Sequence, residues 1–378
     1  HGGHVHAEAV LHDHKMGSHA HPLGDNPVHS HMDKNDSHTL VAGPPPTAAD
    51  GAWTVVVVPD TQNYMNTTDR RGTGKLSYKG EIEVLETSYK WMAQAKEERN
   101  IQLVAHVGDM TSRNTPREWE AIRKCYSHID GELPYVVCVG NHDVTLGENN
   151  ALMDDYFKIS DNPLNEKIFG GYFEEGNLEN AYYTFEQNGQ MFLFLALEWA
   201  VRQEVVDWAD KLCKQYDDHR VFIMIHEYLS EKTRMLSVDD KVWPEYQINE
   251  KQKRVAAEKG VEFNFGYDLR SELIEQNPNI EFLVGGHYGC TRFNEAGELE
   301  YDIQELATAH YSSERESALT FHGMLFNAQW LYNGGDGWIL LLEFSGDNKI
   351  VRAYTYSPYL NAHRVGPEYE YLLERSSD

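Results

Sequence analysis

The chain has 378 residues, of which 41% are hydrophobic and 12% aromatic, so it is long enough and apolar enough to bury a substantial core. Lysine and arginine number 33 against 60 acidic residues, and the resulting net charge of −27 argues against a general nucleic-acid-binding protein. The longest apolar runs, such as the four valines 55–58, are far too short to span a membrane.

The N-terminal segment is rich in histidine, because ten of the 19 histidines lie between His1 and His38. It has few bulky apolar residues and no sustained periodicity, so we expect residues 1–50 to form a disordered tail that contains the Gly-Pro-Pro-Pro run at 43–46. Imidazoles at this density bind Zn²⁺, Cu²⁺ or Ni²⁺ loosely, so metal capture and a merely solvated leader both stay open. Because the chain begins with His instead of Met, we expect a secreted or periplasmic mature protein.

From Trp53 onward the sequence alternates between strand and helix patterns. β-Branched and apolar runs predict buried strands at 53–58, 101–107 and 135–139. Apolar residues at helical spacing predict helices over 80–99 and 118–129. Strands and helices that alternate with short connections are typical of βαβ units, so a parallel sheet covered by helices is expected.

The second half of the chain adds hairpins to this pattern. It predicts a hairpin formed by 181–186 and 191–197, helices at 201–216 and 269–274, and strands at 220–225, 280–284, 338–344 and 349–356. We therefore expect an α/β fold over residues 51–360, with two sheets packed face to face as a β-sandwich flanked by helices. A polar segment at 228–266 is expected to be an inserted loop or cap, and 361–378 a C-terminal tail.

Side chains that can bind metals follow five of the predicted strands. They are Asp60 with Gln62, Asp109, Asn141 with His142 and Asp143, His226, and His287. One such residue after a strand is usually a turn former or a helix cap, but five strand ends of this kind are not explained in that way. Ligands gather beyond the carboxyl ends of parallel strands, so we expect these side chains to lie at one rim.

The donor set contains carboxylates, amides and imidazoles but no thiolate, which suits Mn²⁺, Fe or Zn²⁺. It offers more ligands than one ion needs. Two ions about 3.5–4 Å apart, bridged by one carboxylate, would use all of them and would hydrolyse a phosphoester by in-line attack of a bridging hydroxide.

The segments that carry these residues resemble the motifs of the calcineurin-like metallophosphoesterase superfamily. They read PDTQNY (59–64), GDMTSR (108–113), GNHD (140–143), HEY (226–228) and GGHYG (285–289). PDTQ in the first motif, together with the segments 324–329 and 333–344, is similar to one branch of the superfamily. The resemblance covers roughly residues 53–358 and implies a four-layer α/β/β/α fold with a dinuclear metal centre.

The resemblance also implies a role for each motif residue. Asp60 and Gln62 would bind the first metal, and Asp109 would bridge both metals. The ligands of the second metal would be Asn141, His226 and His287. His142 would act beside the leaving oxygen as general acid or charge stabiliser, with its ring held by Asp143.

Two motif positions depart from the superfamily pattern. Gln62 stands where a histidine is usual, and Gly289 stands where the second histidine of the last motif would be, so the first metal is one ligand short. The similar branch has a histidine just before the stretch corresponding to 324–329. We therefore expect His322 to replace the missing ligand, with His310 as the competing candidate.

Other polar residues near the motifs are further candidates for a role at the site. Arg113 is a candidate to clamp a phosphate, although an ion pair with an acidic neighbour explains it equally well. Tyr64 is a candidate to shape substrate access. Glu227 follows a strand and could orient a ligating imidazole, whereas His106 is expected to be a core histidine.

These observations predict a dinuclear metal-dependent phosphoester hydrolase that acts on small organic phosphates, with monoester and diester hydrolysis both open. The alternative is a non-enzymatic protein that binds or delivers metal through its histidine-rich tail. Hydrolysis of a sulfate or another non-phosphate ester on the same scaffold is a third hypothesis.

Overall fold

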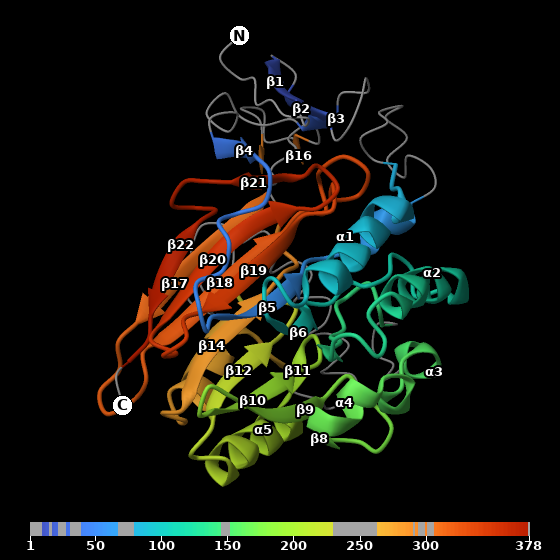
Figure 1. The fold of residues 1–378 in the computed structure, drawn as a ribbon. Helices are drawn as coiled ribbons and strands as arrows, with labels where there is room; N and C mark the ends of the chain where they lie inside the picture. The colour runs from blue at the N-terminus through green and yellow to red at the C-terminus, as the bar shows by residue number, and fades with distance from the viewer. Residues whose placement is uncertain are drawn as a thin grey trace.

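The computed structural model describes residues 39–66, 79–144, 152–229, 263–289 and 306–376, and five short strands outside these ranges for which the backbone alone is described. Two large sheets form its centre (Figure 1). The eight-stranded sheet consists, in spatial order, of β4 (Leu40–Ala42), β21 (Ala362–Arg364), β20 (Ile350–Ser357), β19 (Ile339–Phe344), β5 (Trp53–Val58), β6 (Ile101–His106) and β7 (Tyr135–Val136), with β22 (Tyr371–Glu374) also paired to β20.

The second sheet has seven strands. Their spatial order is β17 (Ala307–Ser313), β18 (Phe321–Asn327), β14 (Ile280–Gly285), β12 (Arg220–Met224), β10 (Gln190–Ala196), β9 (Ala181–Gln187) and β8 (Phe169–Tyr172). Smaller sheets pair β1 (Val10–His14), β2 (Gly17–His21) and β3 (Val28–Ser30), β11 (Val201–Arg202) with β13 (Phe263–Asn264), and β15 (Arg292–Phe293) with β16 (Leu299–Glu300).

Helices cover the outer faces of both sheets (Figure 1). The longer ones are α1 (Ile82–Ala95), α2 (Pro116–Ser127) and α5 (Gln203–Gln215). The shorter ones are α3 (Met153–Tyr156), α4 (Pro163–Ile168), α7 (Gly266–Leu269), the π-helix η5 (Arg270–Ile274) and the 3₁₀ helices η2 (Gln62–Met65) and η4 (Ile159–Asp161). The predicted helices and the predicted α/β sandwich are thus confirmed, with helix ends shifted by a few residues.

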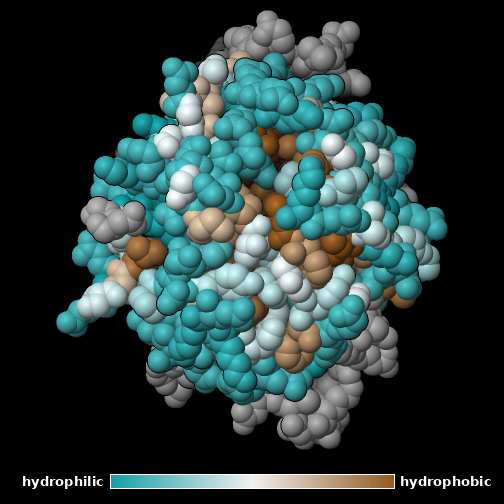
Figure 2. Space-filling model, turned by 60° about the horizontal axis from the view of Figure 1, so that its bottom comes forward, coloured by the Kyte–Doolittle hydropathy of each residue, from teal (hydrophilic) through white to brown (hydrophobic). Residues whose placement is uncertain are grey.

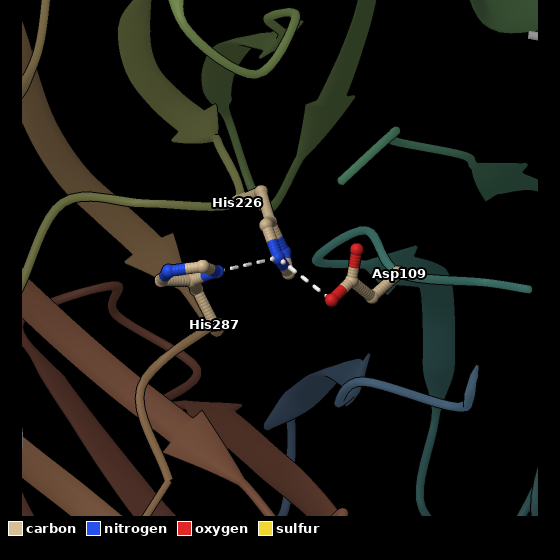
Figure 3. A group of neighbouring side chains, drawn as sticks. All are labelled: Asp109, His226 and His287. Atoms are coloured by element: carbon tan, nitrogen blue, oxygen red, sulfur yellow. Dashed lines mark hydrogen bonds and ion pairs between the residues drawn. The ribbon is translucent and has the colours of Figure 1, made fainter. Parts of the chain in front are cut away.

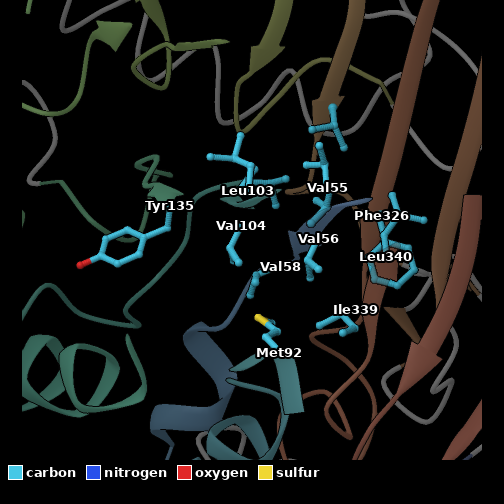
Figure 4. Close-up of a cluster of buried hydrophobic side chains, with 14 of the residues drawn as sticks. Val55, Val56, Val58, Met92, Leu103, Val104, Tyr135, Phe326, Ile339 and Leu340 are labelled. Carbon is cyan, nitrogen blue, oxygen red and sulfur yellow. The ribbon is translucent and has the colours of Figure 1, made fainter. Parts of the chain in front are cut away.

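The layers follow from side-chain alternation along the buried strands. In β10, Phe192 and Phe194 belong to the core between the two sheets, whereas Leu193 and Leu195 belong to a second core under helix α5. Figure 4 shows that Val58 of β5 lies beside Met92 of helix α1, on the helix-covered face of the strand. Both faces of each central strand are therefore buried, which is why these strands read as continuous apolar runs.

The central strands are parallel in two groups. Strands β5, β6 and β7 run parallel in the eight-stranded sheet, and β10, β12, β14 and β18 run parallel in the seven-stranded sheet. Aromatic rings from the two sheets contact one another in the space between them, with 5.1 Å between the ring centroids of Trp53 and Phe192 and 5.6 Å between those of Phe344 and Phe282. This packing fixes the two sets of strand ends relative to one another.

Both predicted tails are partly wrong. Residues 40–42 form β4, which pairs with β21, and the Arg99 guanidinium donates to the carbonyl groups of Pro45 and Pro46. The segment 361–378 contributes β21 and β22 to the eight-stranded sheet. The edge of this sheet needs hydrogen-bonding partners, and chain segments with little apolar periodicity supply them.

Several expectations concern parts of the chain outside the described residues. These are most of the proposed insertion at 228–266 and the side chains of the histidine-rich segment 1–38. Within the described part of the chain, no helix is both long and apolar enough to cross a membrane. Figure 2 shows one face of the molecule as mostly hydrophilic, with hydrophobic residues gathered around a hollow near its middle.

Candidate metal centre

The predicted ligands come together where the carboxyl ends of the parallel strands of both sheets meet. Asp60 follows β5, Asp109 follows β6 and Asn141 follows β7 in one sheet, while His226 and His287 follow β12 and β14 in the other. Apart from Asn141 and His287, which are partly exposed, these side chains are buried. The sandwich therefore joins loops that lie up to 227 residues apart in the chain.

Four donor atoms surround one point in this cluster. The Nε2 atom of His226 lies 3.1 Å from Asp109 Oδ2 and 3.2 Å from Asn141 Oδ1, and His287 Nδ1 lies 3.0 Å from the same Asn141 oxygen. His226 and His287 point toward one another, with 3.2 Å between Nε2 and Nδ1 (Figure 3). One carboxylate, one amide oxygen and two imidazoles form a donor set that fits a divalent cation.

The tautomer of His226 is set by its second ring nitrogen. Nδ1 lies 2.9 Å from the carbonyl oxygen of Val107, which can only accept, so Nδ1 carries a hydrogen and Nε2 faces the cluster. Such a hydrogen bond from the far side of the ring is the usual way in which proteins orient a ligating imidazole.

A second group of oxygen atoms lies beside the first. The Gln62 amide nitrogen is 2.9 Å from Asp109 Oδ2 and 2.5 Å from Gln329 Oε1, and the Gln329 amide nitrogen is 3.4 Å from Asp60 Oδ2. The Gln62 Oε1 atom is buried and has no hydrogen-bond partner among the described residues. An orphaned buried oxygen amid carboxylates is an arrangement that a cation would satisfy.

Burial and charge pairing shift the pKa values of these groups in opposite directions. Burial raises the pKa of Asp60 to about 7. Burial also acts to raise the pKa of Asp109, but the charges of His226 and His142 outweigh it and hold that pKa well below its usual range. Burial acts to lower the pKa of His226, yet Asp109 and Asp60 raise it to about 10. Two adjacent buried carboxylates thus need a compensating positive charge, which favours cation binding.

The backbone is strained at two of the proposed ligands. Asp109 and His287 both have left-handed conformations, with φ of 53° and 70°, which non-glycine residues adopt rarely. Neighbouring glycines permit close approach to the carboxylates, because a Cβ at Gly140 would lie 2.2 Å from Asp109 Oδ1 and one at Gly286 would lie 2.0 Å from Asp60 Oδ1. This explains why glycine opens both the GNHD motif and the histidine-bearing part of the GGHYG motif.

His142 and Asp143 are both at the site, but Asp143 does not hold the His142 ring. The ring is held by the Ser112 carbonyl oxygen, 2.8 Å from Nδ1. The Asp143 carboxylate instead accepts hydrogen bonds from the N–H groups of Met110, Thr111 and Gly140 and from the Thr111 hydroxyl. Asp143 therefore joins the loop after β6 to the loop after β7, and the expectation that it orients the imidazole is wrong.

The structure places His322 and His310 away from the centre, so neither completes the first metal site. Strands β14 and β18 are parallel, with His322 opposite Phe282, five residues before His287. At about 3.3 Å per residue, His322 lies roughly 16 Å below the rim, where it bonds to Ser312 Oγ at 2.7 Å. His310 lies on β17, stacked on Tyr371 with 3.7 Å between ring centroids.

Two predicted substrate-contacting residues differ in their exposure. Tyr64 is buried, and its hydroxyl accepts a hydrogen bond from the Gly337 N–H at 2.8 Å, so Tyr64 is a structural residue and the expectation of substrate contact is wrong. The Arg113 side chain is exposed, while its backbone N–H donates to Glu118 at 2.8 Å. Arg113 therefore stays a candidate for phosphate binding.

Glu227 lies behind His287, on the side of the cluster that holds the two imidazoles. Its two oxygens accept hydrogen bonds from Trp199 Nε1 at 2.7 Å and from the Tyr288 hydroxyl at 2.6 Å, and one of them lies 4.0 Å from His287 Nε2. His106 is also buried behind the site, where Nε2 contacts Thr61 Oγ1 at 3.0 Å. Burial lowers the pKa of His106 to about 3, which keeps the ring neutral, as expected for a core histidine.

Gln329 is also at the site, although the sequence did not predict this position. It lies two residues beyond β18, and the segment 321–327 was not predicted to be a strand. Had that strand been recognised, Gln329 would have met the same criterion as the other ligands, which is a polar side chain just after a parallel strand.

The chain matches known proteins in both sequence and structure. The sequence profile of the calcineurin-like phosphoesterase family matches residues 54–289, which is more than half of the chain. The chain therefore belongs to the calcineurin-like phosphoesterase family.

Individual relatives are distant. The uncharacterized protein YvnB of Bacillus subtilis (strain 168) is 24% identical over 279 residues, which cover 73% of this chain but only 18% of that protein. Among solved structures, a dimetal phosphatase from Danio rerio aligns with 86% of this chain and 99% of its own, at 11% identity and a TM-score of 0.45. A purple acid phosphatase from yellow lupin (Lupinus luteus) seeds aligns with 97% of this chain and 58% of its own, at 13% identity and a TM-score of 0.43.

Proposed function

We propose that this chain hydrolyses small organic phosphoesters at a centre that holds two divalent cations. The observation that carries the proposal is the convergence of Asp60, Asp109, Asn141, His226 and His287 from five separate strand ends. Asp109 lies between the two groups of donors, because its Oδ2 contacts both Gln62 and His226. It is therefore the carboxylate suited to bridge two ions.

Two bound cations would supply positive charge for the phosphoryl oxygens and would lower the pKa of the attacking water. The chain provides the rest of the chemistry. The buried carboxylates and imidazoles would hold the ions, and the Asp143 hydrogen bonds fix the loops that carry Asp109 and Asn141. A protein with a net charge of −27 needs such local positive charge to attract an anionic substrate.

His142 is positioned to handle the leaving group. Its backbone N–H donates to Asp109 Oδ1 at 2.9 Å, and its Nδ1 donates to the Ser112 carbonyl oxygen. The Nε2 atom of this partly exposed ring is thereby available to exchange a proton with the leaving oxygen.

Turnover of p-nitrophenyl phosphate and bis-p-nitrophenyl phosphate with Mn²⁺ or Zn²⁺ tests the proposal and separates monoester from diester hydrolysis. We expect Asp109→Asn to abolish turnover and His142→Ala to reduce it by about 10²–10⁴-fold, the usual contribution of general acid–base catalysis. His310→Ala is the matched control, since His310 lies outside the site and the variant should keep wild-type turnover. Unchanged turnover in either site variant would refute the proposal.

A further inference from the structure

Gln329 lies at the first metal site, where the motifs leave one histidine ligand missing. Its side chain is only 6% exposed. Its Oε1 lies 2.5 Å from the Gln62 amide, and its Nε2 lies 3.4 Å from Asp60 Oδ2 and 3.3 Å from the His287 carbonyl oxygen. Every one of these neighbours belongs to the motifs that form the centre.

The fold also explains why residue 289 cannot supply that ligand. A Cβ placed on Gly289 would lie 2.0 Å from Nε1 of Trp330, so the indole fills the space that a side chain at this position would need. Trp330 directly follows Gln329 in the sequence. The segment after β18 therefore closes the position at 289 and at the same time brings Gln329 to the site.

The backbone of this segment holds Gln329 in place independently of its side chain. Its N–H donates to Asn327 Oδ1 at 3.0 Å, and its carbonyl oxygen accepts from the Asn63 amide at 2.7 Å. The Asn327 amide in turn donates to the Tyr288 carbonyl oxygen at 3.2 Å. These contacts link the segment to the loops after β5 and β14, which carry Asp60 and His287.

We propose that Gln329 is a ligand of the first metal and that this metal is bound through oxygen atoms alone. The inference rests on the proposed two-cation centre. The donors to this first metal would be Asp60, Gln62, Asp109 and Gln329. In the structure the Gln62 amide nitrogen lies between Asp109 Oδ2 and Gln329 Oε1, while its own Oε1 is buried without a partner. A half-turn of that amide brings Oε1 beside the other two oxygens, and all of them can then face one cation.

The two positions consequently differ in the metals that they prefer. An all-oxygen position favours hard cations such as Mg²⁺ and Mn²⁺, whereas the position with His226 and His287 favours borderline cations such as Zn²⁺ and Fe. Neutral amide oxygens are also weak donors. The first metal should therefore be exchangeable and the second tightly held.

Electron paramagnetic resonance of Mn²⁺ tests this inference without measuring hydrolysis. Metal-depleted full-length protein is loaded with two equivalents of Mn²⁺, and the free Mn²⁺ released during a Mg²⁺ titration is measured. Mn²⁺ is used because the imidazoles of the N-terminal segment favour Zn²⁺, Cu²⁺ and Ni²⁺. We expect the wild-type protein to release one equivalent and to keep the other.

Two substitutions of Gln329 give opposite expectations. Gln329→Leu should weaken binding of one Mn²⁺ equivalent by at least about tenfold. Gln329→His should bind both equivalents and raise the Mg²⁺ concentration needed for release by at least about tenfold, since imidazole is a poor Mg²⁺ ligand. Gln276→Leu makes the same chemical change on the surface and should behave as wild type.

The outcomes separate this inference from the proposed function. Unchanged Mn²⁺ affinity in Gln329→Leu, or an unchanged Mg²⁺ midpoint in Gln329→His, would overturn the role of Gln329. If Gln329→Leu fails to fold, as judged by its melting transition, the Gln329→His measurement decides alone. A protein that shows the expected binding but hydrolyses no phosphoester would refute the proposed function and leave the ligand assignment standing.

Discussion

The Thr111 hydroxyl offers a test of how the metal-binding loops are held together. Thr111 is fully buried, and its Oγ1 donates to Asp143 Oδ1 at 2.8 Å. Asp143 also accepts from the N–H groups of Met110 and Gly140, so its carboxylate connects the loop that carries Asp109 to the loop that carries Asn141. Thr111→Val removes one of these hydrogen bonds and keeps the shape of the side chain.

The magnitude follows from the burial of both partners. A hydrogen bond to a charged group contributes about 1.5–3 kcal/mol to stability, and valine leaves no cavity that would add to the loss. The Thr111 N–H still bonds to Asp143 at 2.8 Å, so the carboxylate keeps three donors. We therefore expect Thr111→Val to lower the free energy of unfolding by about 2 kcal/mol.

Urea unfolding monitored by tryptophan fluorescence measures this loss. Thr111→Ser is the control, because serine keeps the hydroxyl and loses only a methyl group, at a cost of about 1 kcal/mol or less. Mn²⁺ affinity should also fall in Thr111→Val and stay closer to wild type in Thr111→Ser. Equal stabilities and equal Mn²⁺ affinities for the two variants would show that the hydroxyl does not hold these loops.

Two further predictions concern a partly buried carboxyl outside the site and a glycine within it. Burial raises the pKa of Asp154 to about 6, so the free energy of unfolding should fall as the pH rises through this value. Asp154→Asn keeps an acceptor for the Leu178 N–H at 2.9 Å, and it should be more stable than wild type by about 1–2 kcal/mol at pH 8, with no such gain in a melting experiment at pH 4. Gly286→Ala would place a Cβ 2.0 Å from Asp60 Oδ1, so Mn²⁺ binding and turnover should both be lost. Gly346→Ala is the control, because the nearest atom to its Cβ would be 3.2 Å away, and it should retain both. Wild-type Mn²⁺ binding by Gly286→Ala would contradict the close approach of residue 286 to the Asp60 carboxylate.

Apolar run length, helical periodicity and the residues that end each strand were enough to predict most of the central strands, the main helices and six of the proposed metal ligands. These features are local. A buried strand must be apolar on both faces, and an amphipathic helix must place its apolar residues at a spacing near 3.6, so both leave a pattern in the sequence itself. Asp60, Asp109 and Asn141 could be predicted from the sequence because each lies in the loop that follows such a strand.

The positions of His322, Tyr64 and Gln329 depended on tertiary structure. Whether His322 reaches the rim is decided by the register of β18 against β14, a long-range pairing that has no local signature. Tyr64 is buried because the 333–337 turn covers it, and Gln329 enters the site because β18 ends beside β14. Sequence therefore determined which chemical groups are available and roughly where each strand ends. Strand register and sheet packing decided which of these groups meet, because both depend on contacts between residues from 40 to more than 200 positions apart.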